Sequence, residues 1–338
     1  MMEDNTVTHT LTVGKRRGLR QLANEGGIFT MAAEDQRGSL RKMLNPDDPK
    51  SVSAEAMTDV KTDICRALSP YASAMLIDPE FGAAQSITSS ALRGNCGLLV
   101  SLEDSDYEQV GDDRRAKILE GWSVEKIKRM GTSGVKLLAY VRPDRGEATT
   151  YQRDLIARIG DECQTHDIPF ILECVGYPVG GMTVNSPEYA AQKPEIVIET
   201  ARLLSGLGVD VYKAEFPVDA KYEQDETKII DYCKQLDAAC QVPWVVLSAG
   251  VDIDIFRTQV QVACHNGASG FLAGCTIWQK AITLPPEERR RFLATEGVDN
   301  LRTLSEVAHS YATPWTARAN PGFQEETIGA EWYRRYDG

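Results

Sequence analysis

The feature that most constrains this chain is a regular alternation of short apolar runs with longer segments of helical periodicity. Each run is rich in aliphatic or β-branched residues and is followed by a polar or glycine-containing turn, a pattern that predicts strands. Strands are expected at 27–33, 73–78, 97–102, 134–140, 169–174, 209–215, 243–250 and 270–274. Helices are expected at 54–68, 151–166, 194–207, 227–240 and 253–266.

Strand and helix alternating eight times predict parallel βαβ units closed into a single (β/α)₈ barrel of the α/β class. The 338 residues suit one such domain with additions. We expect the barrel core at about 27–285, a leading segment with a helix at 1–26, and a C-terminal helical extension at 285–338. The glycine motifs of nucleotide-binding folds do not follow any predicted strand, which weighs against those folds.

Composition and net charge limit the kinds of partner that the protein can bind. The net charge of −12 and the pI near 5.0 argue against nucleic acid and anionic membranes as partners. The sequence contains no apolar run of about 18 residues and no signal-peptide pattern at its start. The eight cysteines form no CxxC pair and indicate buried, reduced thiols. We expect a soluble cytoplasmic protein that acts on a small molecule. The sequence leaves open whether the protein forms a homo-oligomer.

Charged residues stand where several of the predicted strands end. The chemistry of such barrels takes place at the carboxyl ends of the strands. Lys136, Glu173 and Lys213 occupy these positions, and Asp35 follows the first strand. Each has a structural explanation taken singly, as an ion pair or a helix cap. Burying all four charged groups together would cost free energy, because each charge removed from water needs a partner. Their joint occurrence therefore favours a functional site over a purely structural role.

Two lysines beside carboxylates predict amine catalysis. A lysine attacks a ketone only as the neutral amine, so its pKa must fall from about 10.4. Burial and a second cation both lower it, and Lys136 on the fourth strand suits that role for Lys213 on the sixth. The protonated imine then accepts electrons from a breaking carbon–carbon bond, while Glu173 transfers protons. No cofactor is expected beyond this covalent imine.

Metal and serine chemistry are disfavoured. None of the four histidines, His9, His166, His265 and His309, ends a predicted barrel strand, so a histidine-based zinc site is improbable and no metal is expected. The chain has no GxSxG motif, and Ser248 has no evident histidine partner.

Several segments, in this order, resemble the class I tagatose-1,6-bisphosphate aldolase family, which includes bacterial sulfofructose-1-phosphate aldolases. They include GIFTMAAEDQRGSLRKML (27–44), GVKLLAYVRPD (134–144), ILECVGY (171–177), DVYKAEFPVD (210–219), PWVVLSAGVD (243–252) and GASGFLAGCTIW (267–278). The resemblance spans roughly residues 14 to 285. It implies a metal-independent (β/α)₈ lyase of carbohydrate metabolism that cleaves ketose 1-phosphates into dihydroxyacetone phosphate and an aldehyde through a Schiff base.

The resemblance also implies roles for single residues. Lys213 is then the nucleophile and Lys136 the neighbouring cation. Glu173 and Asp35 are the carboxylates that transfer protons and orient hydroxyls. Gln36 and Arg37 would bind the substrate toward its distal end.

One position departs from the family pattern. The family reads GFLAGR, with an arginine that binds the C1 phosphate, where this chain has Cys275. The lost charge-assisted contact is worth about 2–4 kcal/mol. Main-chain N–H groups around Ser248, Ala249, Gly250 and Gly274 can still hold an anion. Three functions stay open: a ketose-phosphate aldolase, the same chemistry on a donor without a C1 phosphate, and a non-catalytic metabolite-binding regulator.

Overall fold

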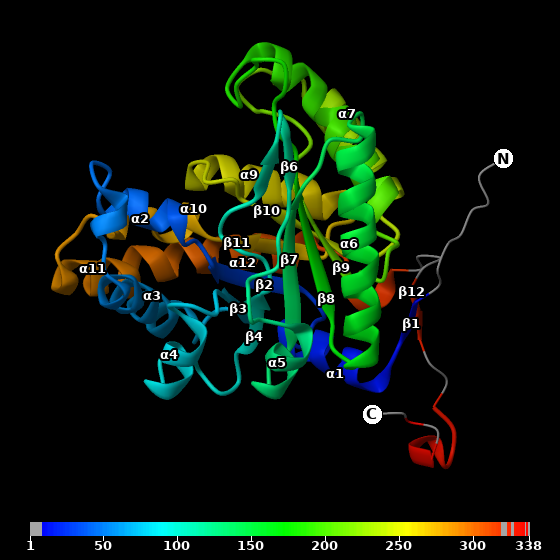
Figure 1. Cartoon of the computed structure of the whole chain (residues 1–338), viewed down its shortest axis with the longest axis horizontal. Helices are drawn as coiled ribbons and strands as arrows, with labels where there is room; N and C mark the ends of the chain where they lie inside the picture. The colour runs from blue at the N-terminus through cyan, green and yellow to red at the C-terminus, as the bar shows by residue number, and fades with distance from the viewer. Residues whose placement is uncertain (1–8, 319–322, 326–327, 335, 337–338) are drawn as a thin grey trace.

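The computed structural model describes residues 9–318, 323–325, 328–334 and 336, and in it eight parallel strands close into a barrel (Figure 1). Their order around the barrel is β10-β11-β2-β3-β4-β7-β8-β9. This confirms the predicted (β/α)₈ fold with an N-terminal helix and a C-terminal helical extension. The barrel strands are β2 (Phe29–Glu34), β3 (Ala74–Ile77), β4 (Gly97–Ser101), β7 (Gly134–Tyr140), β8 (Phe170–Val175), β9 (Val211–Ala214), β10 (Trp244–Leu247) and β11 (Gly270–Ala273).

Helices connect the strands around the barrel. They are α2 (Gly38–Leu44), α3 (Ala54–Leu68), α4 (Ala83–Thr88), α5 (Val124–Arg129), α6 (Gly146–Thr165), α7 (Pro187–Leu204), α8 (Glu226–Ala239), α9 (Ile253–His265) and α10 (Cys275–Trp278). Side chains of Ser or Asp accept N–H groups at the first turns of α3, α5, α7, α8 and α9, as N-cap residues do.

The predicted start of the helix at Pro194 is wrong, because α7 begins at Pro187. Ser186 caps the first turn and Pro187 stands where a missing N–H costs nothing. Pro194 lies inside the helix, where it removes one helical hydrogen bond. Buried residues on both sides of it, among them Tyr189 and Ile196, keep the helix packed on the barrel.

The leading helix α1 (Val13–Leu22) covers the amino end of the barrel (Figure 1). A Cβ on Gly97, the first residue of β4, would lie 2.3 Å from the carbonyl oxygen of Gln21, so the close contact of helix and strand requires glycine there. Buried Lys15 pairs with Asp210 at 2.9 Å just before β9. With this end covered, the carboxyl ends of the strands are left to form a site.

The C-terminal extension packs back on the barrel. It consists of α11 (Pro286–Phe292) and α12 (Val298–Tyr311), and α12 lies against α9. The short strands β1 (His9–Leu11) and β12 (Phe323–Glu325) pair in parallel, so a segment before α1 lies beside a segment that follows α12. Parts of both expected additions lie outside the described residues. These are residues 1–8 of the leading segment and residues 319–322, 326–327, 335 and 337–338 of the extension.

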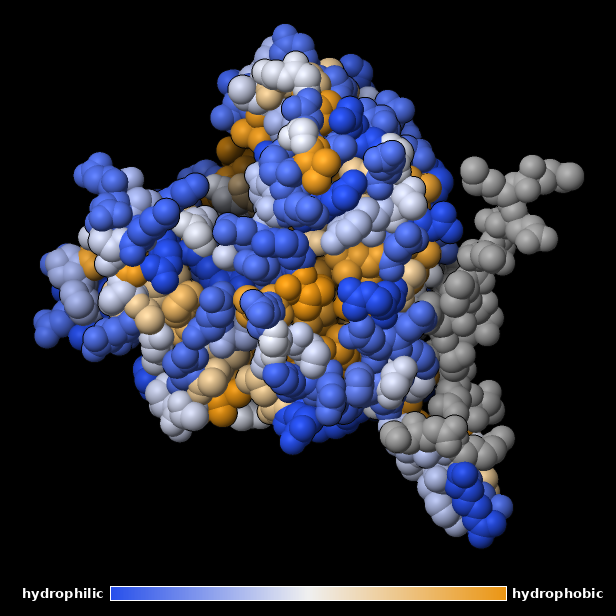
Figure 2. All heavy atoms as spheres, in the orientation of Figure 1, coloured by the Kyte–Doolittle hydropathy of each residue, from blue (hydrophilic) through white to orange (hydrophobic). Residues whose placement is uncertain are grey.

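All eight cysteines carry free thiols, as expected, and only Cys275 is half-buried rather than buried. Figure 2 shows a surface that is mostly hydrophilic at its edges, with hydrophobic atoms gathered in the middle of this face, over β7 and β8. No helix in the described part of the chain is long and apolar enough to cross a membrane.

Candidate active site

The alternation of side chains along the strands decides which residues face the barrel interior. Ile171 in β8 and Val211 in β9 belong to the apolar cluster that fills the barrel. Side chains two residues apart share a face, so Glu173 and Lys213 also point inward. The two are register partners in the β8–β9 pair, and this register places the carboxylate beside the amine.

A cluster of charged groups fills the carboxyl end of the barrel. Lys136 Nζ lies 2.8 Å from Asp35 Oδ2, 2.7 Å from Glu103 Oε1 and 3.0 Å from Glu173 Oε2. Lys213 Nζ lies 2.9 Å from the same oxygen of Glu173. The structure thus brings together Asp35, Lys136, Glu173 and Lys213, and one carboxylate oxygen bridges the two lysines.

Glu103 was missed in the sequence. Glu103 lies two residues beyond Ser101, the last residue of β4, and so continues the inward-facing series of Leu99 and Ser101. Asp35 continues the inward-facing series of β2 in the same way. Glu103 Oε2 accepts a 3.1 Å hydrogen bond from the N–H of Leu138, which fixes the carboxylate against β7. The same two-residue alternation, continued past the apolar run 97–102, is the sequence signal that points to Glu103.

The charge states of the cluster follow from its contacts. Burial alone would raise the pKa of Asp35, but Lys136 and Lys213 outweigh it and lower the pKa to about 2. Burial would also raise the pKa of Glu173, but Lys136 and Lys213 outweigh it and lower that pKa. Burial would lower the pKa of Lys136, but Asp35, Glu103 and Glu173 raise it well above its ordinary value. At neutral pH Lys136 is therefore an ammonium group between carboxylates.

This arrangement differs from the expected pair of neighbouring cations. Three carboxylates surround Lys136 and offset its charge, so its repulsion of Lys213 is weaker than that of an unpaired cation. Glu173, bound to both amines, is the group placed to accept a proton from Lys213.

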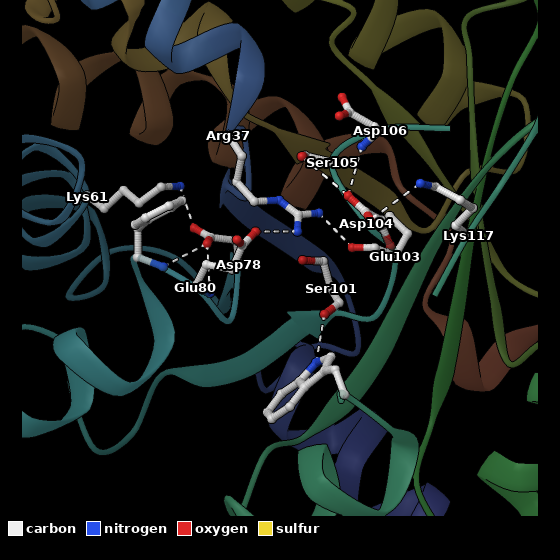
Figure 3. A network of polar contacts seen from close by, with 12 residues as sticks. Arg37, Lys61, Asp78, Glu80, Ser101, Glu103, Asp104, Ser105, Asp106 and Lys117 are labelled. Carbon is white, nitrogen blue, oxygen red and sulfur yellow. Dashed lines mark hydrogen bonds and ion pairs between the residues drawn. The ribbon is translucent and has the colours of Figure 1, made fainter. Parts of the chain in front are cut away.

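Arg37 is almost fully buried, at 6% exposure. Its guanidinium donates to Glu80 Oε2 at 2.8 Å and to the carbonyl oxygen of Glu103 at 2.7 Å (Figure 3). It therefore ties the segment after β3 to the segment after β4. The contact with the distal end of a substrate, expected from the sequence, stays a prediction.

A second buried charge cluster lies on the outer side of β2. Glu34 is the last residue of that strand and faces away from the barrel interior, toward Lys61 of α3. Lys61 Nζ lies 2.7 Å from Asp78 Oδ1, beyond β3 (Figure 3). The side chains of Glu34, Lys61 and Asp78 are at most 1% exposed. Burial, against the attraction of Lys61, raises the pKa of Glu34 well above its ordinary range.

Residues after β10 and β11 meet on the other side of the barrel mouth. Ala249 and Gly250 adopt φ of +47° and +72°, a turn of left-handed residues in which successive N–H groups can face an anion. The N–H of Gly274 donates to Ser248 Oγ at 3.4 Å. A Cβ on Gly274 would lie 2.8 Å from Gln36 Nε2, so glycine makes room for that side chain.

Cys275 begins the short helix α10. Burial, and then the Asp35 carboxylate, raise the pKa of its thiol to about 11. The thiol is therefore neutral at pH 7 and offers no charge to a phosphate. Anion binding by Ser248, Ala249, Gly250, Gly274 and Cys275 stays a prediction.

Across the described ranges, no three His, Cys, Asp or Glu residues are grouped so that they could hold a metal ion. The reactive groups of the charged cluster are amines and carboxylates. Two lysines held by one buried carboxylate can support imine formation and proton transfer.

Known proteins resemble this chain along most of its length. Residues 29–280 match the model of the DeoC/LacD family of aldolases. A tagatose 1,6-diphosphate aldolase 2 of Streptococcus agalactiae serotype III (strain NEM316) is 34% identical over 326 residues, which are 91% of this chain and 99% of the relative.

Solved structures share the fold. An archaeal fructose 1,6-bisphosphate aldolase superimposes with a TM-score of 0.58 at 20% identity, over 87% of this chain and 98% of the other. A second archaeal structure of that enzyme, described with its catalytic lysine covalently bound to the carbinolamine intermediate of the substrate, gives a TM-score of 0.56 at 21% identity, with the same coverage of both chains.

Proposed function

The chain belongs to the DeoC/LacD family of aldolases, and from that premise we propose that it cleaves a ketose phosphate through an imine on Lys213. The observation that carries the proposal is the Glu173 carboxylate oxygen held 2.9 Å from Lys213 Nζ and 3.0 Å from Lys136 Nζ. A carboxylate in contact with the amine can take its proton and return it at each later step.

The reaction proceeds in balanced steps from this geometry. Glu173 takes a proton from Lys213, and the free amine attacks the C2 carbonyl of the ketose to form a carbinolamine. Glu173 returns the proton to the departing hydroxyl, so that water leaves and a protonated imine remains. A carboxylate then removes the proton of the C4 hydroxyl, and the electrons of the C3–C4 bond move into the imine as the aldehyde leaves. The carboxylic acid formed in that step returns its proton to C3 of the enamine, and water adds to the resulting protonated imine, which releases dihydroxyacetone phosphate and the free lysine.

Lys136 and Asp35 support these steps. Lys136 keeps Asp35 and Glu173 ionised, because its ammonium group lowers the pKa of both carboxyls. Asp35, at 12% side-chain exposure and 2.8 Å from Lys136, is placed to accept a hydrogen bond from a substrate hydroxyl. A buried carboxylate in an ordered cluster orients such a group with little reorganisation.

The substrate class follows from the relatives. The Streptococcus agalactiae protein is named for tagatose 1,6-diphosphate, and we propose a ketose 1,6-bisphosphate of this kind for the present chain. Cys275 favours a second candidate, a donor without a C1 phosphate, because its neutral thiol replaces the arginine of the family pattern. Dihydroxyacetone reacting better than its phosphate would support that candidate, and strong phosphate dependence would rule it out.

Reductive trapping tests the mechanism. Borohydride added with dihydroxyacetone phosphate should attach the three-carbon unit to the peptide that contains Lys213, as read by mass spectrometry. Lys213→Met should abolish both trapping and cleavage of tagatose 1,6-bisphosphate. Full cleavage by Lys213→Met would refute the mechanism. Tight binding of ketose phosphates without any trapped imine would instead indicate a metabolite-binding regulator on the aldolase fold.

A further inference from the structure

Arg114 lies on a hairpin above the charged cluster, and sequence analysis gave it no role. The hairpin pairs β5 (Glu108–Val110) with β6 (Asp113–Arg115) in antiparallel order, and β6 packs against β7 and α6. Figure 1 shows β6 near the upper end of β7, where that strand leaves the barrel. The hairpin belongs to the connection between β4 and α5, one of the loops that line the mouth of such a barrel.

The Arg114 guanidinium lies within cation–π distance of three tyrosine rings. Its central carbon lies 5.0 Å from the ring centre of Tyr107, 5.2 Å from that of Tyr140 and 5.4 Å from that of Tyr177. Tyr140 is in phase with Lys136 along β7, so its ring stands over the charged cluster. The Tyr177 hydroxyl donates to Asp113 Oδ1 at 3.2 Å, which fixes the third ring.

Arg114 has no carboxylate partner among the described residues, and neither does its strand neighbour Arg115, which lies over Tyr151 of α6. Tyrosine ring faces offer a guanidinium no oxygen or nitrogen acceptor, so such contacts leave its N–H donors for another group. Neighbouring cations are each engaged by a carboxylate: Arg37 by Glu80, Lys117 by Asp104, Arg142 by Asp144, Arg145 by Asp113 and Lys193 by Glu215. Arg114 is therefore the cation beside Tyr140 that is left available for an anion.

Two observations connect Arg114 to the charged cluster. A cavity of about 20 Å³, room for roughly one water molecule, lies between β7 and the segments that flank the hairpin. Glu103 lines it together with Tyr107 and Tyr140, two of the rings beside Arg114. Burial and then the Glu173 carboxylate raise the pKa of Tyr140, whereas Arg114 and Lys136 lower it. The Tyr140 hydroxyl thus lies within electrostatic reach of both the hairpin cation and the proposed proton-transfer group.

We propose that Arg114 binds the anionic group at the end of the substrate remote from the imine, a phosphate on C6, and thereby selects doubly charged ketoses. This inference rests on the proposed function. Arg37, the residue expected at the distal end, already donates to Glu80 and to the Glu103 carbonyl. Arg114, held among three tyrosine rings and without a carboxylate partner, carries the N–H donors that a bidentate phosphate contact needs.

The test compares the catalytic efficiency, kcat/KM, for tagatose 1,6-bisphosphate with that for tagatose 1-phosphate. In Arg114→Ala the ratio of the two values should fall by about 10- to 100-fold, the loss of one charge-assisted contact. Arg114→Lys keeps the charge but not the fork and should lose part of the preference. Arg115→Ala is the matched control, because Arg115 is on the same strand but stacks on Tyr151 of α6, at 5.1 Å, and the ratio should not change.

Trapping separates this inference from the proposed function. Dihydroxyacetone phosphate carries no distal anion, so borohydride should trap it on Lys213 equally in the wild type and in Arg114→Ala. An unchanged ratio in Arg114→Ala, with normal trapping, would overturn the role of Arg114 alone. An equal ratio loss in Arg115→Ala would also overturn it, because the hairpin as a whole would then be responsible. Failure of the wild type to be trapped would instead overturn the imine mechanism.

Discussion

The Glu215 carboxylate accepts a 2.7 Å hydrogen bond from the main-chain N–H of Gly176. Glu215 follows Lys213 by two residues, just beyond β9, and Gly176 follows Glu173 by three, just beyond β8. The other oxygen of Glu215 lies 3.4 Å from Lys193 Nζ. This contact therefore holds the end of the strand that carries the proposed nucleophile against the end of the strand that carries the proposed proton-transfer group.

Removing this contact should slow the reaction without weakening substrate binding. Glu215→Ala leaves the Gly176 N–H without its acceptor and should lower stability by about 1–3 kcal/mol and kcat by about tenfold or more, with KM little changed. Glu215→Gln keeps an acceptor oxygen and should recover most of kcat. Steady-state kinetics measures kcat and KM of both variants, and thermal unfolding measures their stability. Equally low kcat values in the two variants would show that the charge of Glu215, not its hydrogen bond, is needed.

Asp35 should make stability depend on pH below about 4. Its pKa is lowered to about 2 from 3.8, a difference worth about 2 kcal/mol. A lowered carboxyl pKa adds stability above the unfolded value and loses it as the pH falls toward the folded value. The stability advantage of the wild type over Asp35→Asn should therefore be full at pH 7 and shrink between about pH 4 and pH 2.

Urea unfolding at several pH values measures this advantage. Asp104→Asn is the control, because Asp104 forms a partly exposed pair with Lys117 and accepts the N–H of Asp106, a contact that the Asn oxygen keeps. Its replacement should show little of this pH dependence. A difference between wild type and Asp35→Asn that stays constant down to pH 2 would contradict the prediction.

Glu34 should make stability depend on pH in the direction opposite to Asp35. Burial raises its pKa well above the ordinary value of 4.5, so the stability that its neutral form provides is complete below about pH 4.5 and declines as the pH rises toward the folded pKa. Glu34→Gln keeps a neutral side chain of the same shape. Its thermal midpoint relative to the wild type should therefore increase between pH 5 and pH 9. A relative midpoint that does not vary with pH would show that Glu34 is ionised in the folded protein.

Cys275 should react with alkylating reagents slowly at pH 7 and faster as the pH approaches 11, because burial raises the pKa of its thiol to about 11. It is the half-buried thiol of the eight, so peptide mass spectrometry after a short treatment with iodoacetamide should find the label there and not on the buried seven. Dihydroxyacetone phosphate should slow the labelling if the thiol lies beside the bound donor. Labelling that this compound leaves unchanged would place Cys275 outside the donor site.

The barrel could be predicted from the sequence because each of its βαβ units has a local signature. Apolar runs of strand length, helical periodicity between them and Ser or Asp at helix starts are properties of neighbouring residues. The error at Pro194 arose from the same local reading, because proline usually marks a helix start, whereas the packing of α7 on the barrel compensates for a proline inside the helix.

The sequence by itself determined that Lys136, Glu173 and Lys213 lie on barrel strands and Asp35 just beyond one, because the two-residue alternation of side chains and the positions of the apolar runs are both properties of the local sequence. Only the tertiary structure decided which of these groups touch. The register of β8 against β9 puts Glu173 beside Lys213, and the closure of the barrel brings Asp35, on a strand distant in sequence, within 2.8 Å of Lys136. Contacts between strands depend on register and curvature, which are set by packing across the whole barrel.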